Sequence, residues 1–352
     1  MKSGRVALIG RPNVGKSTLL NALLGEKMAI ISDKPQTTRT TILGIKQRPE
    51  GEIIFIDNPG IHRPLHKLNK RMMNLVISSL ETADLLCWLI DATQPFGQGD
   101  NFVLSLLEKV NRPVFLLINK VDIIRKDKIL PIIDHYKDLL PFKEIIPISA
   151  LRKINLDILE KKIMEYLPEA EAGEKTEEKI YLPLRFQVAE IIREKLLAQV
   201  EDELPFVTAV YVEKIEDRIS GQRLEELDYT SLIKQKEVAS SEQEKGSLKT
   251  KGIKKKQEPT APGVRKKTRR LEGLIYINAS IFVERDNQVG IVVGHRGQRL
   301  KQIGLEARKE LEDILGARIF LDLAVKVKEH WRDKPEVLDL IESQKEVLSR
   351  KD

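Results

Sequence analysis

The fold of this chain is decided by the stretch Gly10-Arg11-Pro12-Asn13-Val14-Gly15-Lys16-Ser17. The apolar residues that end at Ile9 predict a short buried strand before it, and the leucines between Leu19 and Leu24 recur at helical spacing after it. A strand, the pattern Gly-x-x-x-x-Gly-Lys-Ser and a helix, in this order, are the context of a phosphate-binding loop. The alternative, a chance match in a glycine-containing turn, is the weaker interpretation because both flanking elements are present.

Each residue type in this loop has a physical task. The glycines let the backbone curl so that its N–H groups point at phosphate oxygens, and the helix that follows adds its dipole. Lys16 supplies a positive charge for the β and γ phosphates, and the Ser17 hydroxyl is a candidate Mg²⁺ ligand. With Thr18, the stretch from Gly10 onward forms the first predicted part of a GTP site.

Size and composition limit the possible classes of protein. The 352 residues suggest two or three domains, and 5% aromatic residues argue against a surface rich in base-stacking rings. The single cysteine, Cys87, lies in an apolar run, which excludes an internal disulfide and indicates a buried hydrophobic side chain. We find neither a signal peptide nor an apolar run of about 20 residues, so we expect a cytoplasmic protein.

The net charge of +7 is concentrated in one segment. Between Lys245 and Arg270 there are eleven basic residues and one acidic residue, Glu258, which gives this segment a net charge of +10 and leaves the remainder at −3. The basic character therefore belongs to this segment, and not to the two ends of the chain.

Two further stretches predict Mg²⁺ ligands and a nucleotide-sensing loop. Thr38, in the polar stretch Gln36-Thr37-Thr38-Arg39, is our candidate for a second hydroxyl ligand, although Thr37, Thr40 and Thr41 lie close and a solvated turn is an alternative. The strand 53–56 ends in an Asp-x-x-Gly pattern, where Asp57 would bind Mg²⁺ and Gly60 would donate its N–H to the γ-phosphate. The candidate residues of this second stretch are Asp57, Asn58, Pro59, Gly60 and Ile61.

The most discriminating motif is Asn119-Lys120-Val121-Asp122, which follows an apolar strand over residues 112–118. Guanine presents two adjacent donors, N1–H and the exocyclic amine, and one carboxylate can accept both. Adenine would leave the Asp122 carboxylate unsatisfied, at a cost of about 1–3 kcal/mol. Lys120 would pack along the base and Asn119 would brace the loop. After a last strand over 145–148, Ser149 and Ala150 would offer a backbone N–H to the guanine carbonyl.

Loops of this kind, each after a strand and in this order, describe a translation-factor-class GTPase. The motifs Gly-Arg-Pro-Asn-Val-Gly-Lys-Ser and Gln-Thr-Thr-Arg resemble those of the bacterial TrmE–Era–EngA group of GTPases. The resemblance implies an α/β P-loop domain over residues 1–168 with a mostly parallel sheet flanked by helices. It also implies that Asn13 ligates K⁺, as in some relatives; a purely structural role in the loop is the alternative.

The chain departs from related patterns at two positions. Ile61 stands where the Ras type has a water-orienting glutamine, so hydrolysis must depend on other groups, and we expect a slow, partner-stimulated reaction. Asn58 stands where the family usually has threonine; because Asp57 and Gly60 are intact, we expect little effect.

After a linker at 169–180, the second half predicts a smaller α+β domain over residues 181–330. The expected order is a helix (186–197), a strand (206–212), a strand (274–283), a strand or helix lead-in (288–293, with 291–293 taken as a strand), Gly294-His295-Arg296-Gly297, a helix (300–315) and a strand (319–327). This order resembles a type II KH domain, in which Gly-x-x-Gly admits the RNA backbone. The predicted RNA contacts are Gly294, His295, Arg296, Gly297, Arg299 and Lys301.

A GTPase domain followed by a KH domain resembles the Era family of ribosome-assembly GTPases, over nearly the whole chain except residues near 217–272. The resemblance implies binding near the 3′ end of 16S rRNA, a role in 30S subunit biogenesis and occasional membrane association. The likeness leaves open a non-enzymatic RNA chaperone or a membrane-tethered anchor. We expect a monomer.

Residues 217–272 form an insert between two strands that the family joins by a short loop. It is rich in lysine, glutamate and glutamine with few large apolar residues, so we expect disorder. Its basic half could contact RNA phosphates or anionic lipid, and a solvated loop without a role is the alternative. Residues 331–352 predict a terminal helix, with Val337, Leu338, Ile341, Val347 and Leu348 at helical spacing, packed on the KH domain.

Overall fold

The computed structural model describes residues 1–34, 36–169, 182–201, 204–232 and 273–345. The chain divides into two compact units. The first comprises Met1–Ile180, Val200–Val207 and His330–Leu338; the second comprises Tyr181–Gln199, Thr208–Glu329 and Asp339–Asp352. Among the described helices, none is both long enough and apolar enough to cross a membrane.

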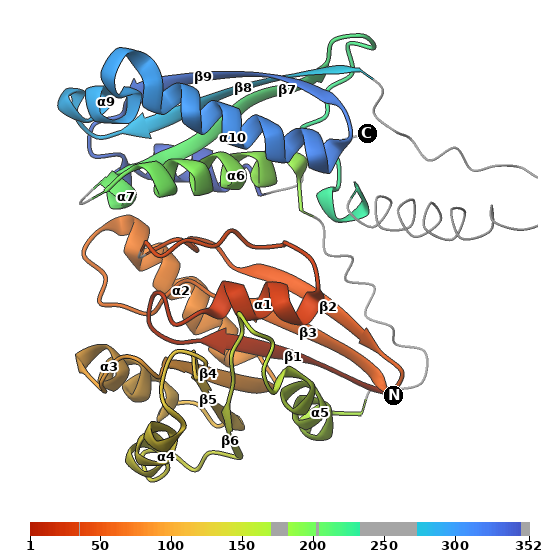
Figure 1. The fold of residues 1–352 in the computed structure, drawn as a ribbon, viewed down its shortest axis with the longest axis vertical. Helices are drawn as coiled ribbons and strands as arrows, with labels where there is room; N and C mark the ends of the chain where they lie inside the picture. Colours follow the sequence, from red (N-terminus) through yellow and green to blue (C-terminus); the bar gives the residue numbers. More distant parts are fainter. Residues whose placement is uncertain (35, 170–181, 202–203, 233–272, 346–352) are drawn as a thin grey trace, which may run out of the picture. The chain divides into compact units, whose positions relative to one another are not determined.

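The first unit is built on a six-stranded sheet with the order β2-β3-β1-β4-β5-β6 (Figure 1). All neighbouring strands are parallel except the β2–β3 pair, which is antiparallel. The strands span β1 Lys2–Ile9, β2 Ile42–Arg48, β3 Gly51–Asp57, β4 Leu85–Asp91, β5 Val114–Asn119 and β6 Glu144–Pro147. This arrangement confirms the predicted mostly parallel α/β class.

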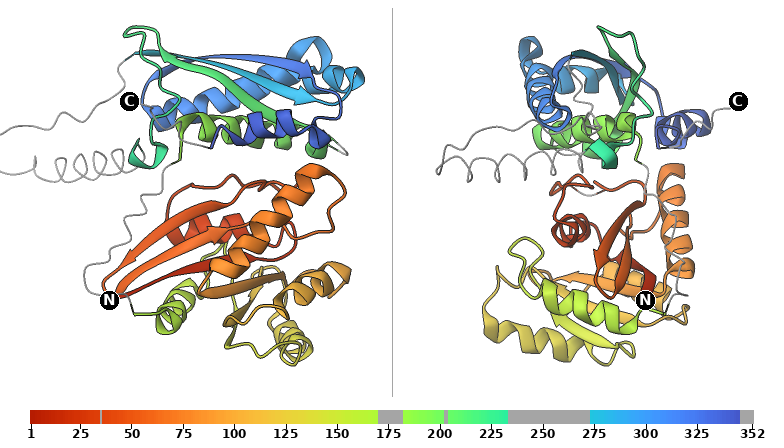
Figure 2. Two further views of the ribbon diagram at one scale, coloured as in Figure 1. Left: turned by 180° about the vertical axis from the view of Figure 1, so that it is seen from behind. Right: turned by 90° about the vertical axis from the view of Figure 1, so that its right-hand side faces the viewer.

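Helices cover both faces of this sheet, which is why its central strands are apolar throughout. The helices are α1 Lys16–Leu24, α2 Lys67–Thr82, α3 Gln98–Leu107, α4 Ile129–Tyr136 and α5 Leu156–Tyr166. On one face, Ile9 and Trp88 pack with side chains of α2, α3 and α4. On the other, Phe115 makes an edge contact with Tyr166 of α5. Figure 1 shows α1 in front of the strands, and the view from behind in Figure 2 shows α2 in front.

The second unit is a three-stranded sheet, β7-β8-β9, with helices packed on it. Strands β7 and β8 are antiparallel, whereas β8 and β9 are parallel. Its elements are α6 Leu184–Gln199, β7 Ala209–Asp217, β8 Leu274–Val283, α9 Asp286–Val293, α10 Gln298–Leu315 and β9 Arg318–Val327. This is the helix, strand, strand, helix, Gly-x-x-Gly, helix, strand order predicted for the KH domain.

Two local predictions in this half are wrong. Residues 291–293 belong to helix α9 and not to a strand, because a short run of β-branched residues does not by itself distinguish a strand from a buried helix. Phe206 lies in a short helix, α7 Leu204–Val207, and strand β7 begins only at Ala209. The apolar pattern alone placed the start of that strand too early.

The expectation of disorder from residue 217 is also wrong for residues 217–232. This stretch contains the buried side chains of Leu224 and Tyr229, and backbone hydrogen bonds tie Tyr229 to Leu182 and Leu224 to Ile215. A few apolar side chains among many polar ones are enough to order a segment that lies against an existing core. The rest of the predicted insert, residues 233–272, and the linker from residue 170 onward lie outside the described residues.

The predicted terminal helix is α11, Pro335–Glu342, in which Val337 and Leu338 are buried. Beyond it, the buried Gln344 side chain pairs with the backbone of β7, accepting from Val212 N at 2.7 Å and donating to Val210 O at 3.1 Å. Val347 and Leu348 lie outside the described residues.

Candidate nucleotide site and nucleic-acid interface

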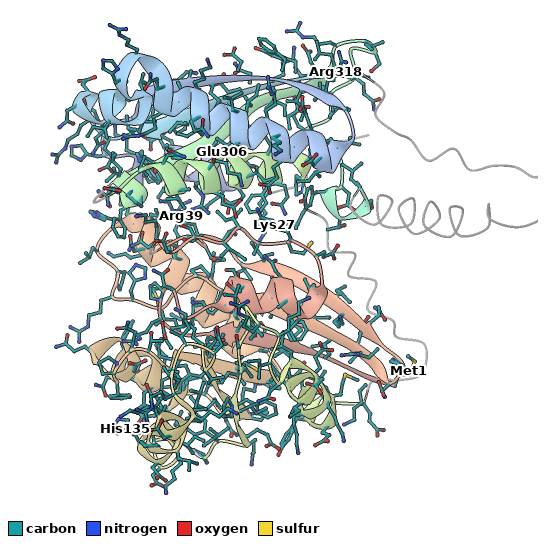
Figure 3. All side chains as sticks on the ribbon, in the orientation of Figure 1. Met1, Lys27, Arg39, His135, Glu306 and Arg318 are labelled. Atoms are coloured by element: carbon teal, nitrogen blue, oxygen red, sulfur yellow. The ribbon has the colours of Figure 1, made fainter. Side chains whose placement is uncertain are left out.

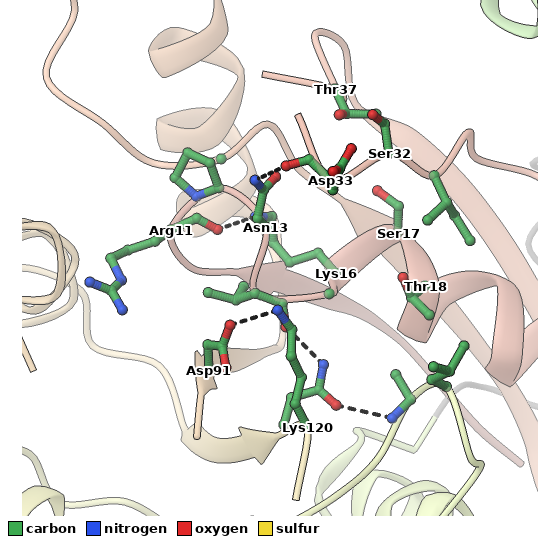
Figure 4. A pocket seen from close by; sticks show the side chains of 18 of the residues that line it. Arg11, Asn13, Lys16, Ser17, Thr18, Ser32, Asp33, Thr37, Asp91 and Lys120 are labelled. Atoms are coloured by element: carbon green, nitrogen blue, oxygen red, sulfur yellow. Dashed lines mark hydrogen bonds and ion pairs between the residues drawn. The ribbon is translucent and has the colours of Figure 1, made fainter. Parts of the chain in front are cut away.

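A cavity of about 850 Å³ opens in the first unit beside the loops that follow β1, β3, β5 and β6 (Figure 4). Parallel strands present their carboxyl ends at one edge, so motifs far apart in sequence meet there. The cavity brings together Arg11, Pro12, Asn13, Val14, Gly15, Lys16, Ser17, Thr18, Thr38, Gly60, Asn119, Lys120, Asp122, Ser149 and Ala150 from the predicted set.

The first loop depends on two glycines with positive φ. Gly10 has φ 148°, and a Cβ there would lie 2.4 Å from the carbonyl oxygen of Leu89. Gly15 has φ 97°, and a Cβ there would lie 2.3 Å from the Nδ2 atom of Asn119. Both positions therefore exclude any side chain, because backbone strain and steric overlap act together.

The amine of Lys16 is buried within the loop. Its Nζ donates to the carbonyl oxygens of Gly10 at 3.1 Å and Arg11 at 2.8 Å. Burial lowers the pKa of Lys16 to about 8, although the nearby Asp57 carboxylate favours the charged form. A buried ammonium group that is held by carbonyl oxygens at the N-terminus of a helix can bind an anionic ligand.

Asp57 joins Ser17 and Thr38 in one oxygen cluster. The Ser17 hydroxyl donates to Asp57 Oδ2 at 2.6 Å and lies 2.8 Å from Thr38 Oγ1. Burial raises the pKa of Asp57 to about 6, against the opposing effects of Lys16, Ser17 and Thr38. The second carboxylate oxygen, Oδ1, is buried without a hydrogen-bond partner among the described residues. These oxygens suit a hard divalent cation such as Mg²⁺.

Asn119 connects two loops of the cavity. Its Nδ2 donates to the Val14 carbonyl at 2.7 Å, and its Oδ1 accepts from Ala150 N at 3.0 Å. Lys120 donates to the carboxylate of Asp91 at 2.6 Å, which holds the stem of Lys120 beside the cavity. Asp122 lines the same cavity and is exposed.

Three predicted side chains point elsewhere. Asn58 is fully buried and donates to the Leu8 carbonyl while accepting from the Ser79 hydroxyl at 2.6 Å, so it braces α2 against β1. Ile61 is 1% exposed and belongs to the apolar core, and Val121 packs against that core. Only the backbone of Ile61 reaches the first loop, through its N–H to the Gly10 carbonyl at 3.0 Å.

Several residues that line the cavity were not predicted from the sequence. Asp91 ends strand β4 and fixes Lys120, and its place at the carboxyl end of a buried strand was an available signal. Ser32, Asp33 and Gln36 line the cavity from the polar stretch that precedes β2 (Figure 4). Nothing in the residue types alone separates them from a solvated loop.

In the second unit, the Gly-x-x-Gly motif forms a tight turn between α9 and α10. Gly294 has φ 73° and Gly297 φ 77°, while Arg296 between them adopts φ 49°. A Cβ on Gly294 would lie 2.7 Å from Arg299 Cβ, whereas the space beside Gly297 is open. Arg299 donates to the Ile291 carbonyl, and His295, Arg296 and Lys301 are exposed around the turn. The turn thus exposes backbone and cations at the start of a long helix, as a phosphate-binding surface requires.

The buried lysine gives the nucleotide-free protein a characteristic pH dependence. Between pH 8 and 10.5 the unfolded chain keeps a proton on Lys16 that the folded chain has lost, so the free energy of unfolding rises with pH in this window. The contribution amounts to about 3 kcal/mol. Denaturant titrations should show the unchanged protein gaining free energy of unfolding relative to Lys16→Met as the pH rises from 8 to 10.5. Parallel curves for the two proteins would contradict it.

Comparisons with known proteins agree with both parts of the chain. Residues 5–120 match the family described as "50S ribosome-binding GTPase", and residues 263–332 match the "KH domain" family.

Two solved structures are similar over almost the entire length. One is the crystal structure of Era in complex with MgGDPNP and nucleotides 1506–1542 of 16S ribosomal RNA, at 37% identity and a TM-score of 0.78, covering 97% of this chain and 98% of that chain. The other is a single-residue variant of Aquifex aeolicus Era bound to GDP·AlF4⁻, at 37% identity and a TM-score of 0.77, covering 97% of this chain and 99% of that chain. With this identity over nearly all of both chains, the protein belongs to the Era family of GTPases.

Proposed function

We propose that the protein is a GTP-hydrolysing switch whose KH domain binds 16S rRNA near its 3′ end during assembly of the 30S subunit. The observation that supports the nucleotide half is one cavity that brings Lys16 and Ser17 of the loop after β1 together with Asp122 of the loop after β5, while Ser17 also donates a hydrogen bond to Asp57. The RNA half is supported by the Gly294–Gly297 turn with its exposed cations, and by the related Era that was crystallised with 16S rRNA nucleotides.

Guanine selection follows from Asp122. The carboxylate is exposed in the open cavity, where it can accept from N1–H and the exocyclic amine of guanine together. Asn119 fixes the loop that carries it, and Ala150 is positioned by the same asparagine. Adenine has no matching donor pair, so the carboxylate would lose its hydration without compensation.

Mg²⁺ fits the oxygen cluster of Ser17, Thr38 and Asp57, because Asp57 Oδ1 has no partner among the described residues and two hydroxyls lie beside the carboxylate. When bound, the ion would neutralise phosphate charge that develops during hydrolysis. Lys16 would exchange its two carbonyl partners for phosphate oxygens and hold the same charge. Ile61 is in the core, so no side chain at that position orients water, and hydrolysis depends on this charge stabilisation.

Replacing Asp122 should change nucleotide choice. In Asp122→Asn an amide donor faces the guanine donors, so GDP affinity should fall about 10²-fold, while the affinity for the xanthine nucleotide XDP, which presents a carbonyl there, should rise. Isothermal titration with GDP, ADP and XDP measures this.

Asp127→Asn is the matched control, because Asp127 is exposed and pairs with Arg125, away from the cavity. A guanine preference that is unchanged in Asp122→Asn would refute the assignment.

We also propose a K⁺ ion beside Asn13. The Asn13 amide donates to the Asp33 carbonyl, which leaves its Oδ1 as an oxygen ligand at the cavity rim. Turnover in K⁺ should exceed turnover in Li⁺, and Asn13→Ala should lose that difference. Equal rates of GTP hydrolysis in K⁺ and Li⁺ would contradict the K⁺ site. Asn13 would then have only the structural role of its hydrogen bond to Asp33.

Charge reversal at the KH turn should weaken RNA binding. In His295→Asp/Arg296→Asp the new carboxylates repel phosphate, so affinity for a fragment of the 16S rRNA 3′ end should fall by about tenfold or more, with a shallower salt dependence. Filter binding across several salt concentrations measures both.

Arg308→Asp/Lys309→Asp changes the net charge by −4, against −3 for the turn variant with its neutral histidine, on an exposed stretch of α10 about three turns away, and it serves as the control. Crosslinks from the RNA to residues 294–299, with a non-hydrolysable GTP analogue bound, would show directly that the RNA lies at this turn. An equal loss in both variants would reveal only a general charge effect.

We further propose that the protein works as a cytoplasmic monomer with at most peripheral membrane contact. Each site is complete within one chain, and guanine nucleotides and ribosomal RNA are cytoplasmic ligands. The basic segment Lys245–Arg270 complements anionic lipid as well as RNA. Light scattering tests the oligomeric state, and flotation with anionic liposomes, with and without residues 245–270, tests the membrane contact.

A further inference from the structure

One face of the sheet of the second unit is buried, and the other face is open at the end where β8 and β9 begin, since Ser280 and Phe282 further along β8 are buried on that side too. Along β8 and β9, Ile275, Ile277 and Ile319 are buried, whereas Leu274 and Phe320 on the alternating positions are exposed. Helix α6 contacts β7, α10 contacts β9, and α9 contacts both β8 and β9. Figures 1 and 2 show α6 and α10 together on one side of the β7–β8–β9 sheet. The other face therefore carries exposed apolar side chains that the packing of these helices does not explain.

Three planar groups form a stack on this open face. Tyr276 and Phe320 are register partners on β8 and β9, and their rings lie 5.9 Å apart at an angle of 20°. The guanidinium carbon of Arg218 lies 4.2 Å from the centroid of the Tyr276 ring. Because β8 lies between the other two strands, Arg218 and Phe320 approach Tyr276 from opposite sides.

Polar contacts hold the inner members of the stack in place. The Tyr276 hydroxyl donates to Asp322 at 3.2 Å, and Arg218 pairs with Glu216 at 3.5 Å. The backbone N–H of Arg218 donates to the Leu274 carbonyl at 2.9 Å, which fixes the loop after β7 to the start of β8. A stack fixed at this end presents its other end as a rigid surface.

That other end is the ring of Phe320. Its side chain is on the edge strand β9 and the residue is 57% exposed, the largest exposure of any aromatic residue in the part of the chain that the structure describes. Among the residues that the structure describes, Tyr276 has a planar neighbour on each side, Arg218 and Phe320, whereas the planar neighbour of Phe320 is Tyr276. The free ring face accepts one more planar group, and nucleobases are planar groups that stack on aromatic rings without regard to sequence.

The surrounding charge selects among planar ligands. Of the cations close to the stack in the chain, Lys214 and Arg218 both pair with Glu216. Arg318, two residues before Phe320 and labelled in Figure 3, has no ion pair with any described residue. In the sequence, the segment Lys245–Arg270, with its net charge of +10, ends four residues before Leu274. An arginine-bearing protein partner would meet like charge, whereas a nucleic-acid strand brings phosphates.

We propose that Phe320, backed by Tyr276 and Arg218, is a second subsite for single-stranded RNA, at which one base stacks while Arg318 contacts an adjacent phosphate. The subsite is separate from the Gly294–Gly297 turn, because the 18 residues of α10 lie between them in the chain and span about 27 Å. It rests on the proposed RNA function and extends it to a longer strand: the turn holds one part and the open sheet face holds another.

The test uses the full-length protein and a fluorescein-labelled oligoadenylate of about 20 nucleotides. Phe320→Ala should weaken binding by about fivefold or more, and Phe320→Tyr should keep the affinity because it keeps the ring. Phe320→Leu is the control for apolar area without stacking and should behave like Phe320→Ala. The circular dichroism spectrum and the GTP hydrolysis rate should not change, because an exposed residue of the second unit is replaced.

A spectroscopic signal reports the stack itself. Trp88 and Trp331 are 0% and 1% exposed, so the indole introduced by Phe320→Trp is the accessible one among the described positions. Oligoadenylate should quench its emission, and the quenching should saturate with the binding curve. Quenching by an arginine-rich peptide but not by RNA would overturn the proposal in favour of a protein partner.

Combining variants separates this proposal from the proposed function. If both are correct, His295→Asp/Arg296→Asp and Phe320→Ala each weaken binding, and the combined variant is weaker than either. If Phe320→Ala binds like the unchanged protein while the turn variant loses affinity, the second subsite does not exist. If only Phe320→Ala loses affinity, the stack binds RNA and the KH turn does not.

Discussion

One buried amide, that of Asn119, holds the nucleotide site together. It donates to the phosphate-loop carbonyl of Val14 and accepts from the backbone N–H of Ala150, so loops after β1, β5 and β6 share a single side chain. The close approach of its Nδ2 to Gly15 explains why that position has no Cβ. Both groups of the amide are used, and the residue is 2% exposed, so no other side chain of this size could replace it without leaving a buried polar group unpaired.

The electrostatics of the same site favour a charged ligand. Lys16 and Asp57 are buried close enough that each stabilises the charged form of the other. Burial nevertheless lowers the pKa of Lys16 and raises the pKa of Asp57, so it favours the neutral form of both. A phosphate group beside Lys16 and a cation beside Asp57 would each restore the favourable charge state. Binding of a metal–nucleotide complex therefore relieves an unfavourable burial in addition to making contacts.

The second unit uses the two sides of one small sheet differently. Its helices bury one face and set the Gly294–Gly297 turn at the start of α10, where the positive end of the helix dipole favours a phosphate group. The open face carries a short stack of planar groups that ends in an exposed ring. The low aromatic content argued against an extended stacking surface. It could not show that two of the few aromatic rings, those of Tyr276 and Phe320, lie side by side.

Much of this protein follows from the sequence because its signals are local. The phosphate loop, the Asp57–Gly60 turn and the Asn119–Asp122 motif each follow a buried strand, and strand ends meet at one edge of a parallel sheet, so both the fold and the principal site were predictable. The KH order was predictable for the same reason, although α9 and α7 were misassigned where short apolar runs suit either helix or strand. Tertiary structure alone decided which side chains face the cavity and which complete the core.

Asn58 and Ile61 lie within predicted motifs in the loop after β3 yet point inward, because Asn58 accepts a hydrogen bond from Ser79 of α2 and Ile61 packs in the apolar core. Residues 217–232 are ordered because Leu224 and Tyr229 find a core to lie against. The pairing of Tyr276 with Phe320 is set by the register of β8 and β9, which joins residues more than forty positions apart and leaves no trace in either segment alone.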